Sequence, residues 1–469
     1  MARAAERGRR KYARDRHTGA LLDILQAHAL FARFAHMPRQ ESADLLIEAR
    51  WVLPMAPVNT VLADHAVVVT DGRIVAVGPT DRMNARFEPT ERVVRADHAL
   101  LPGFVNAHTH ASATLLRGIP AEAVASAERR YASPDFVRDG TQIAIAEMLQ
   151  AGITCFADVT PFPESTARTA SSARMRVAVG LPLSDQANAW AEGATEHLAK
   201  AEQLWDSYRS DPWVSLYFAL PTPALVSDAT LGRLRRVADE LDARVAMPVQ
   251  ESAAAVHESV ARSGQRPLIR LQSLGLLRPG FTALHMTQLD QDDLPIAARN
   301  GVCVIACPQA DLASATGHCP VARLESSGIT VGLGTAGPAR GGALDILAEA
   351  RAAALSGDAD ASGQARLTAA SALWMATLGG ASALGMSSLI GSIEPGKAAD
   401  LVCLDLGTLA CQPARHPQDT ILFAATRAQA SDVWTSGRAA VSARRLLAFD
   451  EREMLALARQ WAGRVETAI

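Results

Sequence analysis

The segment Leu101-Pro-Gly-Phe-Val-Asn-Ala-His-Thr-His110 reads as a buried β-strand that ends in two histidines. Side chains two residues apart lie on the same face of a strand, so His108 and His110 would face the same space. Two imidazoles at the end of a strand can bind one divalent metal ion. A His-x-His pair also occurs in ordinary loops, so the surrounding sequence decides between the two interpretations. Here Pro102-Gly103 opens the strand, and Thr114-Leu-Leu-Arg-Gly118 follows the histidines.

Strand-length and helix-length segments alternate after this first strand. Seven further apolar stretches of strand length lie at 153–158, 176–182, 214–220, 244–248, 282–285, 302–306 and 329–334. Helical patterns lie between them, for example at 136–151, 228–241 and 344–355. Repeated strand–helix units predict an α/β fold, a (β/α)8 TIM barrel with its active site at the C-terminal strand ends.

Both ends of the chain read as short β-strands, at 45–54, 64–70, 73–78, 399–405 and 433–441. Asp71-Gly72 joins two of these strands and is a strong signal for a two-residue hairpin. We therefore expect a small discontinuous β-sandwich domain formed by both chain ends, at 37–100 and 391–445. The barrel would occupy 101–390, and a C-terminal helix would occupy 446–469.

Residues 1–36 differ from the rest of the chain. Seven Lys and Arg residues fall between positions 3 and 16, and an apolar stretch follows at 20–31. This pattern has three interpretations, which are a targeting peptide, a basic arm for nucleic acid, and an over-long gene start that is not translated. We expect this basic extension to be disordered and to lie outside the packed fold.

The composition is that of a globular enzyme, with 469 residues of which 49% are hydrophobic and 20% are charged. The net charge of −3 gives no sign of a nucleic-acid partner. No apolar run reaches the roughly 20 residues that a membrane-spanning helix needs, so we expect no membrane partner. The six cysteines form no Cys-x-x-Cys motif, which favours a reducing, cytoplasmic compartment.

The strand with its two histidines and the Thr-Leu-Leu-Arg-Gly segment resembles the first barrel strand of the amidohydrolase superfamily. Within it, the chain is most similar to methylthioadenosine/S-adenosylhomocysteine deaminases and chlorotriazine hydrolases. The segment Gly391-Ser-Ile-Glu-Pro-Gly-Lys-Ala-Ala-Asp400 resembles the family's return to its terminal β-structure. The resemblance implies a metal-dependent hydrolase or deaminase that acts on non-peptide C–N bonds of aminopurine-like or triazine-like heterocycles. It also implies zinc or iron as cofactor and a homodimer that binds a small heterocyclic molecule.

The resemblance assigns roles to six residues of this sequence. His108 and His110 match metal ligands, Glu251 matches a carboxylate that transfers protons, and His285 matches a histidine that orients the attacking water. Arg117 and Gln309 are weaker candidates for substrate binding.

Other positions depart from the family pattern. Pro248 stands where the family has a third metal ligand, a histidine. Ala336 stands where it has an aspartate that is both a ligand and the general base. Pro221 and Ala306 replace two further histidines.

We therefore expect a degenerate metal site, with metal weakly bound or absent and catalysis impaired or lost. One alternative is an active hydrolase with a rebuilt metal site that uses His108, His110, Glu251 and His285. A second alternative is a non-catalytic regulatory partner of an active paralogue. Four more residues lie near strand ends and are further candidates for a rebuilt site without a specific role, namely His257, Cys307, Asp311 and His318.

Overall fold

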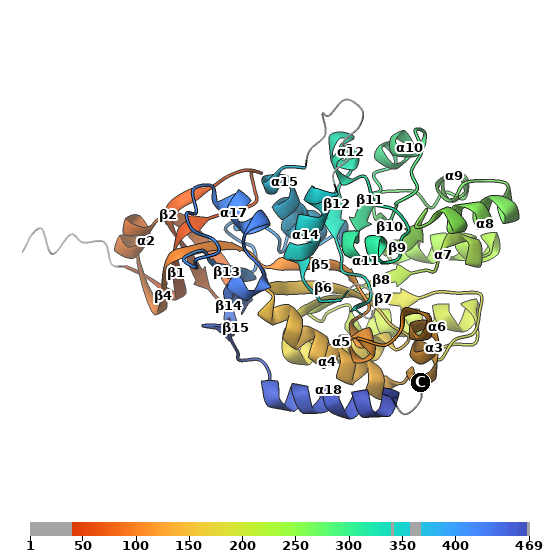
Figure 1. Ribbon diagram of the computed structural model, residues 1–469, viewed down its shortest axis with the longest axis horizontal. Coiled ribbons are helices and arrows are strands. Elements are labelled where there is room, and N and C mark those ends of the chain that lie inside the picture. Colours follow the sequence, from red (N-terminus) through yellow and green to blue (C-terminus); the bar gives the residue numbers. More distant parts are fainter. Residues whose placement is uncertain (1–39, 339–341, 357–366, 467–469) are drawn as a thin grey trace, which may run out of the picture.

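The computed structural model describes residues 40–338, 342–356 and 367–466, so the expected extension at 1–36 lies outside the described residues. Two eight-stranded sheets organise the described chain. One sheet is built from both ends of the chain, and the other forms the barrel beside it (Figure 1). The predicted TIM barrel with a discontinuous terminal β-structure is thereby confirmed.

The barrel strands follow one another in sequence order, and each pairs in parallel with its neighbours. They are β5 (Phe104–Thr109), β6 (Ile153–Val159), β7 (Arg176–Pro182), β8 (Val214–Ala219), β9 (Arg244–Val249), β10 (Phe281–His285), β11 (Cys303–Ala306) and β12 (Val331–Leu333). The first and last strands meet through a parallel bridge between Thr109 and Ala336, where Ala336 N donates to His108 O at 3.0 Å. The sheet therefore closes at the residues that end β5.

Some of the helices that cover the barrel begin at a serine cap. Ser133, Ser227 and Ser252 each accept a hydrogen bond from the first turn of the helix that follows. The helices are α3 (Ala121–Tyr131), α4 (Pro134–Gln150), α5 (Pro163–Ala173), α6 (Ala194–Tyr208), α7 (Asp228–Glu240), α8 (Ala253–Ser263), α9 (Pro267–Ser273), α10 (Asp293–Arg299), α11 (Pro308–Ala313), α12 (Val321–Ser326), α14 (Ile346–Leu355), α15 (Ala369–Trp374) and α16 (Gly380–Ala383). Short 3₁₀ turns lie at η1 (Ala111–Leu116) and η2 (Pro223–Leu225), and a π-helical turn, η3 (Met375–Gly379), precedes α16.

The terminal sheet has the order β16-β15-β14-β13-β4-β1-β2-β3. Its strands are β1 (Glu41–Val52), β2 (Leu62–Thr70), β3 (Arg73–Pro79), β4 (Phe87–Pro102), β13 (Leu401–Asp405), β14 (Ala430–Thr435), β15 (Arg438–Ser442) and β16 (Arg445–Leu446). Helix α2 (Thr80–Arg86) packs against β2 and β3, while α17 (Pro417–Phe423) and the 3₁₀ turn η4 (Arg427–Gln429) precede β14. The predicted Asp71-Gly72 hairpin is confirmed, with φ of +50° and +72° at its two turn residues.

Two strand predictions were wrong in detail. The segment 433–441 is not one strand, because Ser436 and Gly437 have φ of +45° and +74° and turn the chain between β14 and β15. Positive φ at both central residues is the geometry of a tight hairpin turn. Leu101 and Pro102 belong to β4, because they pair with Val402 and Leu401 in the terminal sheet.

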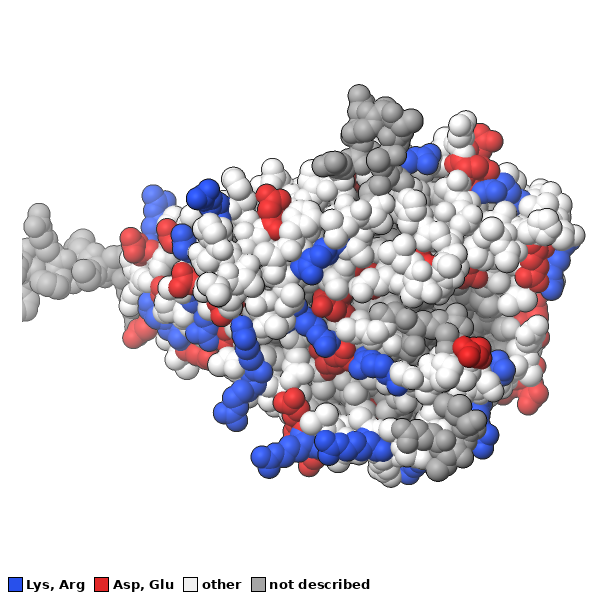
Figure 2. Space-filling view, viewed as in Figure 1, with Lys and Arg blue, Asp and Glu red and all other residues white. Residues whose placement is uncertain are grey.

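The C-terminal helix α18 (Glu451–Glu466) lies along α4 at the bottom of Figure 1. The Trp461 indole donates to the Asp139 carboxylate at 2.9 Å and packs edge-on against Phe136. Figure 2 shows acidic and basic side chains interspersed over one face of the molecule. Within the described ranges, no helix has the length and apolar character required to cross a membrane.

Candidate active site

A pocket of about 360 Å³ lies at the C-terminal ends of the barrel strands. His108, His110, Glu251 and His285 all line it, so the structure brings together four of the six residues that the sequence singled out. The rest of its wall consists of Val124, Glu128, Ser252, Ala310, Asp311, Ser314, Thr316, Ala336 and Gly337. The pocket thus joins residues from five of the eight βα units of the barrel.

The three histidine rings lie close together in this pocket. The His108 ring centroid is 5.2 Å from that of His110 and 5.9 Å from that of His285, and both pairs are edge-to-face. His110 Nδ1 lies 2.9 Å from the carbonyl oxygen of Val159. Burial lowers the pKa of His108 well below its ordinary value, and the neighbouring His110 and His285 lower it further. His108 is therefore held as a neutral imidazole, the form that binds metal ions.

His285 forms a pair with a carboxylate. Its Nδ1 lies 2.7 Å from Asp311 Oδ1, and both side chains are largely buried. Burial alone would lower the pKa of His285, but the hydrogen bond to Asp311 and the charges of Asp311 and Glu251 together leave that pKa raised. Asp311 Oδ2 is buried without a hydrogen-bond partner in the described part of the chain. Asp311 could not be given a specific role from the sequence, because its partner lies 26 residues away.

Glu251 lies on the same wall of the pocket. Burial raises the pKa of its carboxyl group, Asp311 adds to the effect, and His285 opposes it. A histidine paired with a carboxylate, next to a carboxyl group of raised pKa, is a set of groups that can accept and donate protons. The arrangement therefore has the chemistry for acid–base steps on a molecule bound in the pocket.

The backbone at three of these strand ends adopts the left-handed conformation. Gln250 after β9, His285 at the end of β10 and Ala336 after β12 have φ of +52°, +69° and +51°. Such conformations are uncommon for residues other than glycine, and they cluster at functional sites. The barrel also needs a glycine here, because a Cβ on Gly334 would lie 2.7 Å from His108 O.

Arg117 and Gln309, the candidates for substrate binding, contact other residues instead of lining the pocket. Arg117 Nη2 donates to Glu147 at 2.7 Å, and its side chain is partly exposed. The backbone and side-chain nitrogens of Gln309 both donate to Glu349, at 3.0 and 3.1 Å. Burial raises the pKa of Glu349 to about 8.

His257 and His318, two candidates for a rebuilt site, are exposed, and neither lines the pocket.

Asp158, at the end of β6, is a buried polar residue that the sequence did not single out. Its carboxylate accepts hydrogen bonds from Ala111 N at 2.7 Å and Thr166 Oγ1 at 2.8 Å. Burial raises its pKa to about 6, although these hydrogen bonds and the nearby His110 oppose the shift. Asp158 therefore fixes the start of η1, directly after the two histidines of β5.

The donor set does not fit the four-ligand zinc site that the family resemblance implies. Pro248 on β9 has no side-chain donor, and Ala336 contributes only a methyl group to the pocket wall. Among the described residues, no group of three or more His, Cys, Asp and Glu side chains is arranged to hold a metal ion. His108 and His110 are the two positions at the end of β5 at which the sequence keeps the histidines of the family pattern.

A second cavity, of about 630 Å³, adjoins the pocket, because His110 and Glu128 line both. Phe136, Val159, Pro161 and Pro182 give this second cavity a more apolar wall. Apolar walls with a few polar groups are typical of sites for small organic molecules. Together, the two adjoining cavities are polar beside the histidines and apolar beside α3 and α4.

Several known proteins resemble this chain over most of its length. The model of the amidohydrolase family matches residues 99–440. A 5-methylthioadenosine/S-adenosylhomocysteine deaminase from Teredinibacter turnerae is 37% identical over 91% of this chain and 98% of its own length. The same-named protein from Saccharophagus degradans is 33% identical over 92% of this chain and 98% of its own length.

Solved structures show the same fold. An adenosine deaminase from Xanthomonas campestris with bound zinc is 43% identical, with a TM-score of 0.89 over 92% of this chain and all of the other. Atrazine chlorohydrolase from Arthrobacter aurescens, complexed with zinc, has a TM-score of 0.83 over 89% of this chain and all of the other at 22% identity, and so supports the fold alone. This chain belongs to the amidohydrolase family.

Proposed function

We propose that this chain retains the amidohydrolase scaffold and a pocket for a small heterocyclic amine, but is impaired or inactive as a zinc-dependent deaminase. The observation that carries the proposal is the pair Pro248 and Ala336, which stand where the family has a histidine and an aspartate. Neither side chain has an atom that can bind a cation or accept a proton from water. Together, the replacements at Pro248 and Ala336 remove two metal ligands and the general base.

The two remaining ligands support the same conclusion. A catalytic zinc site has three protein ligands and an open position for water. His108 and His110 lie on one strand, and both are neutral as ligands, so they supply no negative charge to balance a dication. We expect zinc bound by this pair alone to exchange readily.

Metal analysis and an activity assay on the same purified protein test the proposal. Protein produced with zinc supplied should contain less than one equivalent after gel filtration. It should also not measurably deaminate 5-methylthioadenosine, S-adenosylhomocysteine or adenosine, the substrates in its relatives' names. Stoichiometric zinc with turnover that His108→Ala abolishes would overturn the proposal.

One observation favours a second candidate, an active hydrolase with a rebuilt metal site. His108, His110, Glu251, His285 and Asp311 all line one pocket in the described structure, and the His108 ring lies within 6 Å, centroid to centroid, of both other histidine rings. A metal ion among them would recruit His285, which is no ligand under the first candidate. His285→Ala would then remove the bound zinc as completely as His108→Ala, whereas under the first candidate neither variant has stoichiometric zinc to lose.

A further inference from the structure

A separate cavity of about 550 Å³ opens at the other end of the barrel. Residues that precede strands form its mouth, among them Asp242 before β9, Gly280 before β10 and Arg209 before β8. They belong to the N-terminal face, whereas the candidate active site lies at the C-terminal strand ends. The two cavities share no lining residue.

The cavity reaches into the barrel, where three of the strand residues that line it are alanines. Ala107 of β5, Ala178 of β7 and Ala246 of β9 line its inner part. Bulky branched side chains normally fill the interior of a TIM barrel. The three alanines leave a space whose volume falls in the roughly 300–1,000 Å³ range of small-molecule sites.

Arg244 supplies the cavity with an uncompensated positive charge. Its Nε donates to Ala383 O at 3.3 Å, and its Nη2 donates to Ser382 O at 3.2 Å. The Cys303 thiol also lies beside the guanidinium group. In the described residues no carboxylate lies within ion-pair distance of Arg244. A guanidinium group has five N–H donors, so donors remain for a ligand at this half-buried position.

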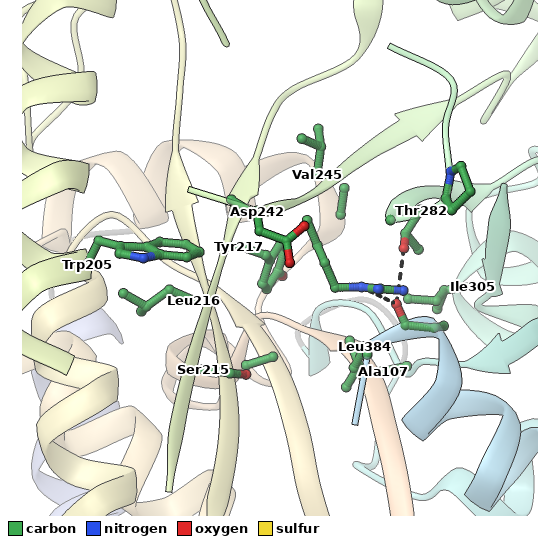
Figure 3. A pocket seen from close by; sticks show the side chains of 18 of the residues that line it. Ala107, Trp205, Ser215, Leu216, Tyr217, Asp242, Val245, Thr282, Ile305 and Leu384 are labelled. Atoms are coloured by element: carbon green, nitrogen blue, oxygen red, sulfur yellow. Dashed lines mark hydrogen bonds between the residues drawn. The ribbon is translucent and has the colours of Figure 1, made fainter. Parts of the chain in front are cut away.

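Apolar and aromatic side chains form about half of the remaining lining. Figure 3 shows Trp205 and Leu216 on one side of the cavity, and Thr282 and Ile305 on the other. Tyr217 is 7% exposed and lies on the wall between them. Rings of this kind favour a flat apolar partner, and an arginine binds a carboxylate through two parallel hydrogen bonds.

The charges at the mouth favour an anion as well. Arg209 and Arg278 lie there with Asp242 as the only carboxylate of the described lining. Arg278 is already 3.4 Å from Asp239, outside the cavity, so Arg244 is the deeper and less satisfied of these cations. Three arginines against one aspartate give the described lining a positive balance, which favours an anionic ligand.

We propose that this cavity is a second ligand site, which binds a small aromatic carboxylate with its ring among the alanines and its carboxylate on Arg244. The site is independent of the proposed function, because it shares no residue with the pocket of His108 and His285. It needs no metal ion and no chemical step.

Titration with benzoate, followed by ligand-observed NMR on the full-length protein, tests the site. Benzamidine is the matched probe, since it has the same ring with a positive charge. We expect saturable binding of benzoate and none of benzamidine. Arg244→Met should weaken benzoate binding about tenfold or more, because it removes a hydrogen bond to a charged group. Arg278→Met, at the mouth of the cavity, is the control variant and should keep most of the affinity for benzoate.

Two filling variants locate the bound probe. Ala178→Leu and Ala246→Leu each place a larger side chain in the cavity without altering Arg244, and thermal unfolding shows whether each variant is folded. Both should abolish benzoate binding. The proposal is overturned if folded filling variants still bind benzoate, if Arg278→Met costs as much as Arg244→Met, or if benzoate does not bind up to its solubility limit. Loss of binding on Glu251→Gln instead would place the probe in the other pocket and would also overturn it.

Discussion

The proposed loss of the zinc site rests on two residues, Ala336 and Pro248. Ala336 has φ of +51°, a conformation that aspartate adopts several-fold more readily than most other residues. Pro248 pairs with Leu284 of β10, while the pairing of β9 with β8 ends earlier, at Ala246. The backbone at both positions can therefore accept the side chains that the family uses.

The first prediction follows from this compatibility. The double variant Pro248→His/Ala336→Asp should raise the affinity for zinc by about 100-fold or more, since even outer-shell partners of a metal site are worth 10–100-fold. Competition with a chromophoric chelator measures the change. The same double variant with His108→Ala should lose the gain. An unchanged affinity in folded protein would show that these two positions do not face the metal-binding pair. Restored turnover could additionally require Pro221→His.

Glu349 is a buried carboxyl group whose folded-state pKa of about 8 exceeds its ordinary value of 4.5. Its contribution to stability is fully present below the unfolded pKa and is lost as pH rises through the folded pKa. The wild type should therefore lose stability between about pH 4.5 and 8, by up to about 1.4 kcal/mol per pH unit from this group. Glu349→Gln should remove that slope and be the more stable protein at pH 8. Urea unfolding at pH 5 and pH 8 measures it, with the exposed Glu325→Gln as control, and equal slopes in all three proteins would contradict the prediction.

At the scale of elements, Trp461 makes the main polar and aromatic contacts between α18 and α4. Trp461 is 5% exposed, donates to Asp139 and packs against Phe136. Asp139 also accepts from Arg138 at 2.8 Å, so it keeps one partner if the indole is lost. The charged hydrogen bond and the aromatic packing of Trp461 therefore contribute separately to the free energy of unfolding.

Trp461→Ala should lower the free energy of unfolding by about 3–5 kcal/mol, because it leaves a cavity under α18. Trp461→Phe keeps an aromatic ring but loses the hydrogen bond to Asp139. It should lower the free energy of unfolding by about 1.5–3 kcal/mol. Chemical denaturation measures both changes. A loss of less than about 1 kcal/mol for the alanine variant would mean that α18 contributes little to stability.

At the scale of the whole molecule, a buried ion pair joins the two sheets. Arg176 of β7 donates to Asp400, which precedes β13, at 2.8 Å, and to Ser436 at 2.6 Å. The side chains of Arg176 and Asp400 are 8% and 1% exposed. Asp400 also accepts from Ser436 N at 2.7 Å, so one carboxylate connects the barrel, the start of β13 and the β14–β15 turn.

Removing one member of this pair should cost about 3–5 kcal/mol, because the other charge remains buried without its partner. Arg176→Met and Asp400→Leu should each show this loss in urea unfolding. The double variant should recover part of it, since it buries no unpaired charge. Additive losses in the double variant would show that the pair acts through its separate hydrogen bonds.

Patterns in the sequence were enough to predict most of the secondary-structure elements and several residues of the pocket. The alternation of apolar segments predicted the eight barrel strands, and Asp71-Gly72 predicted its hairpin, because backbone preferences act over a few residues. The family resemblance singled out His108, His110, Glu251 and His285, and these four residues line one pocket. The Ser436-Gly437 turn was missed, although a Ser-Gly dipeptide is a turn signal, because apolar residues continue on both sides.

Only the tertiary structure decided which distant residues meet. The His285–Asp311 pair, the Arg176–Asp400 pair and the membership of Leu101 and Pro102 in the terminal sheet all join separate segments. The cavity beside Arg244 likewise depends on three alanines from three strands. Such contacts depend on how whole elements pack against one another. The residues next to a side chain in the sequence do not determine which distant residue it will contact.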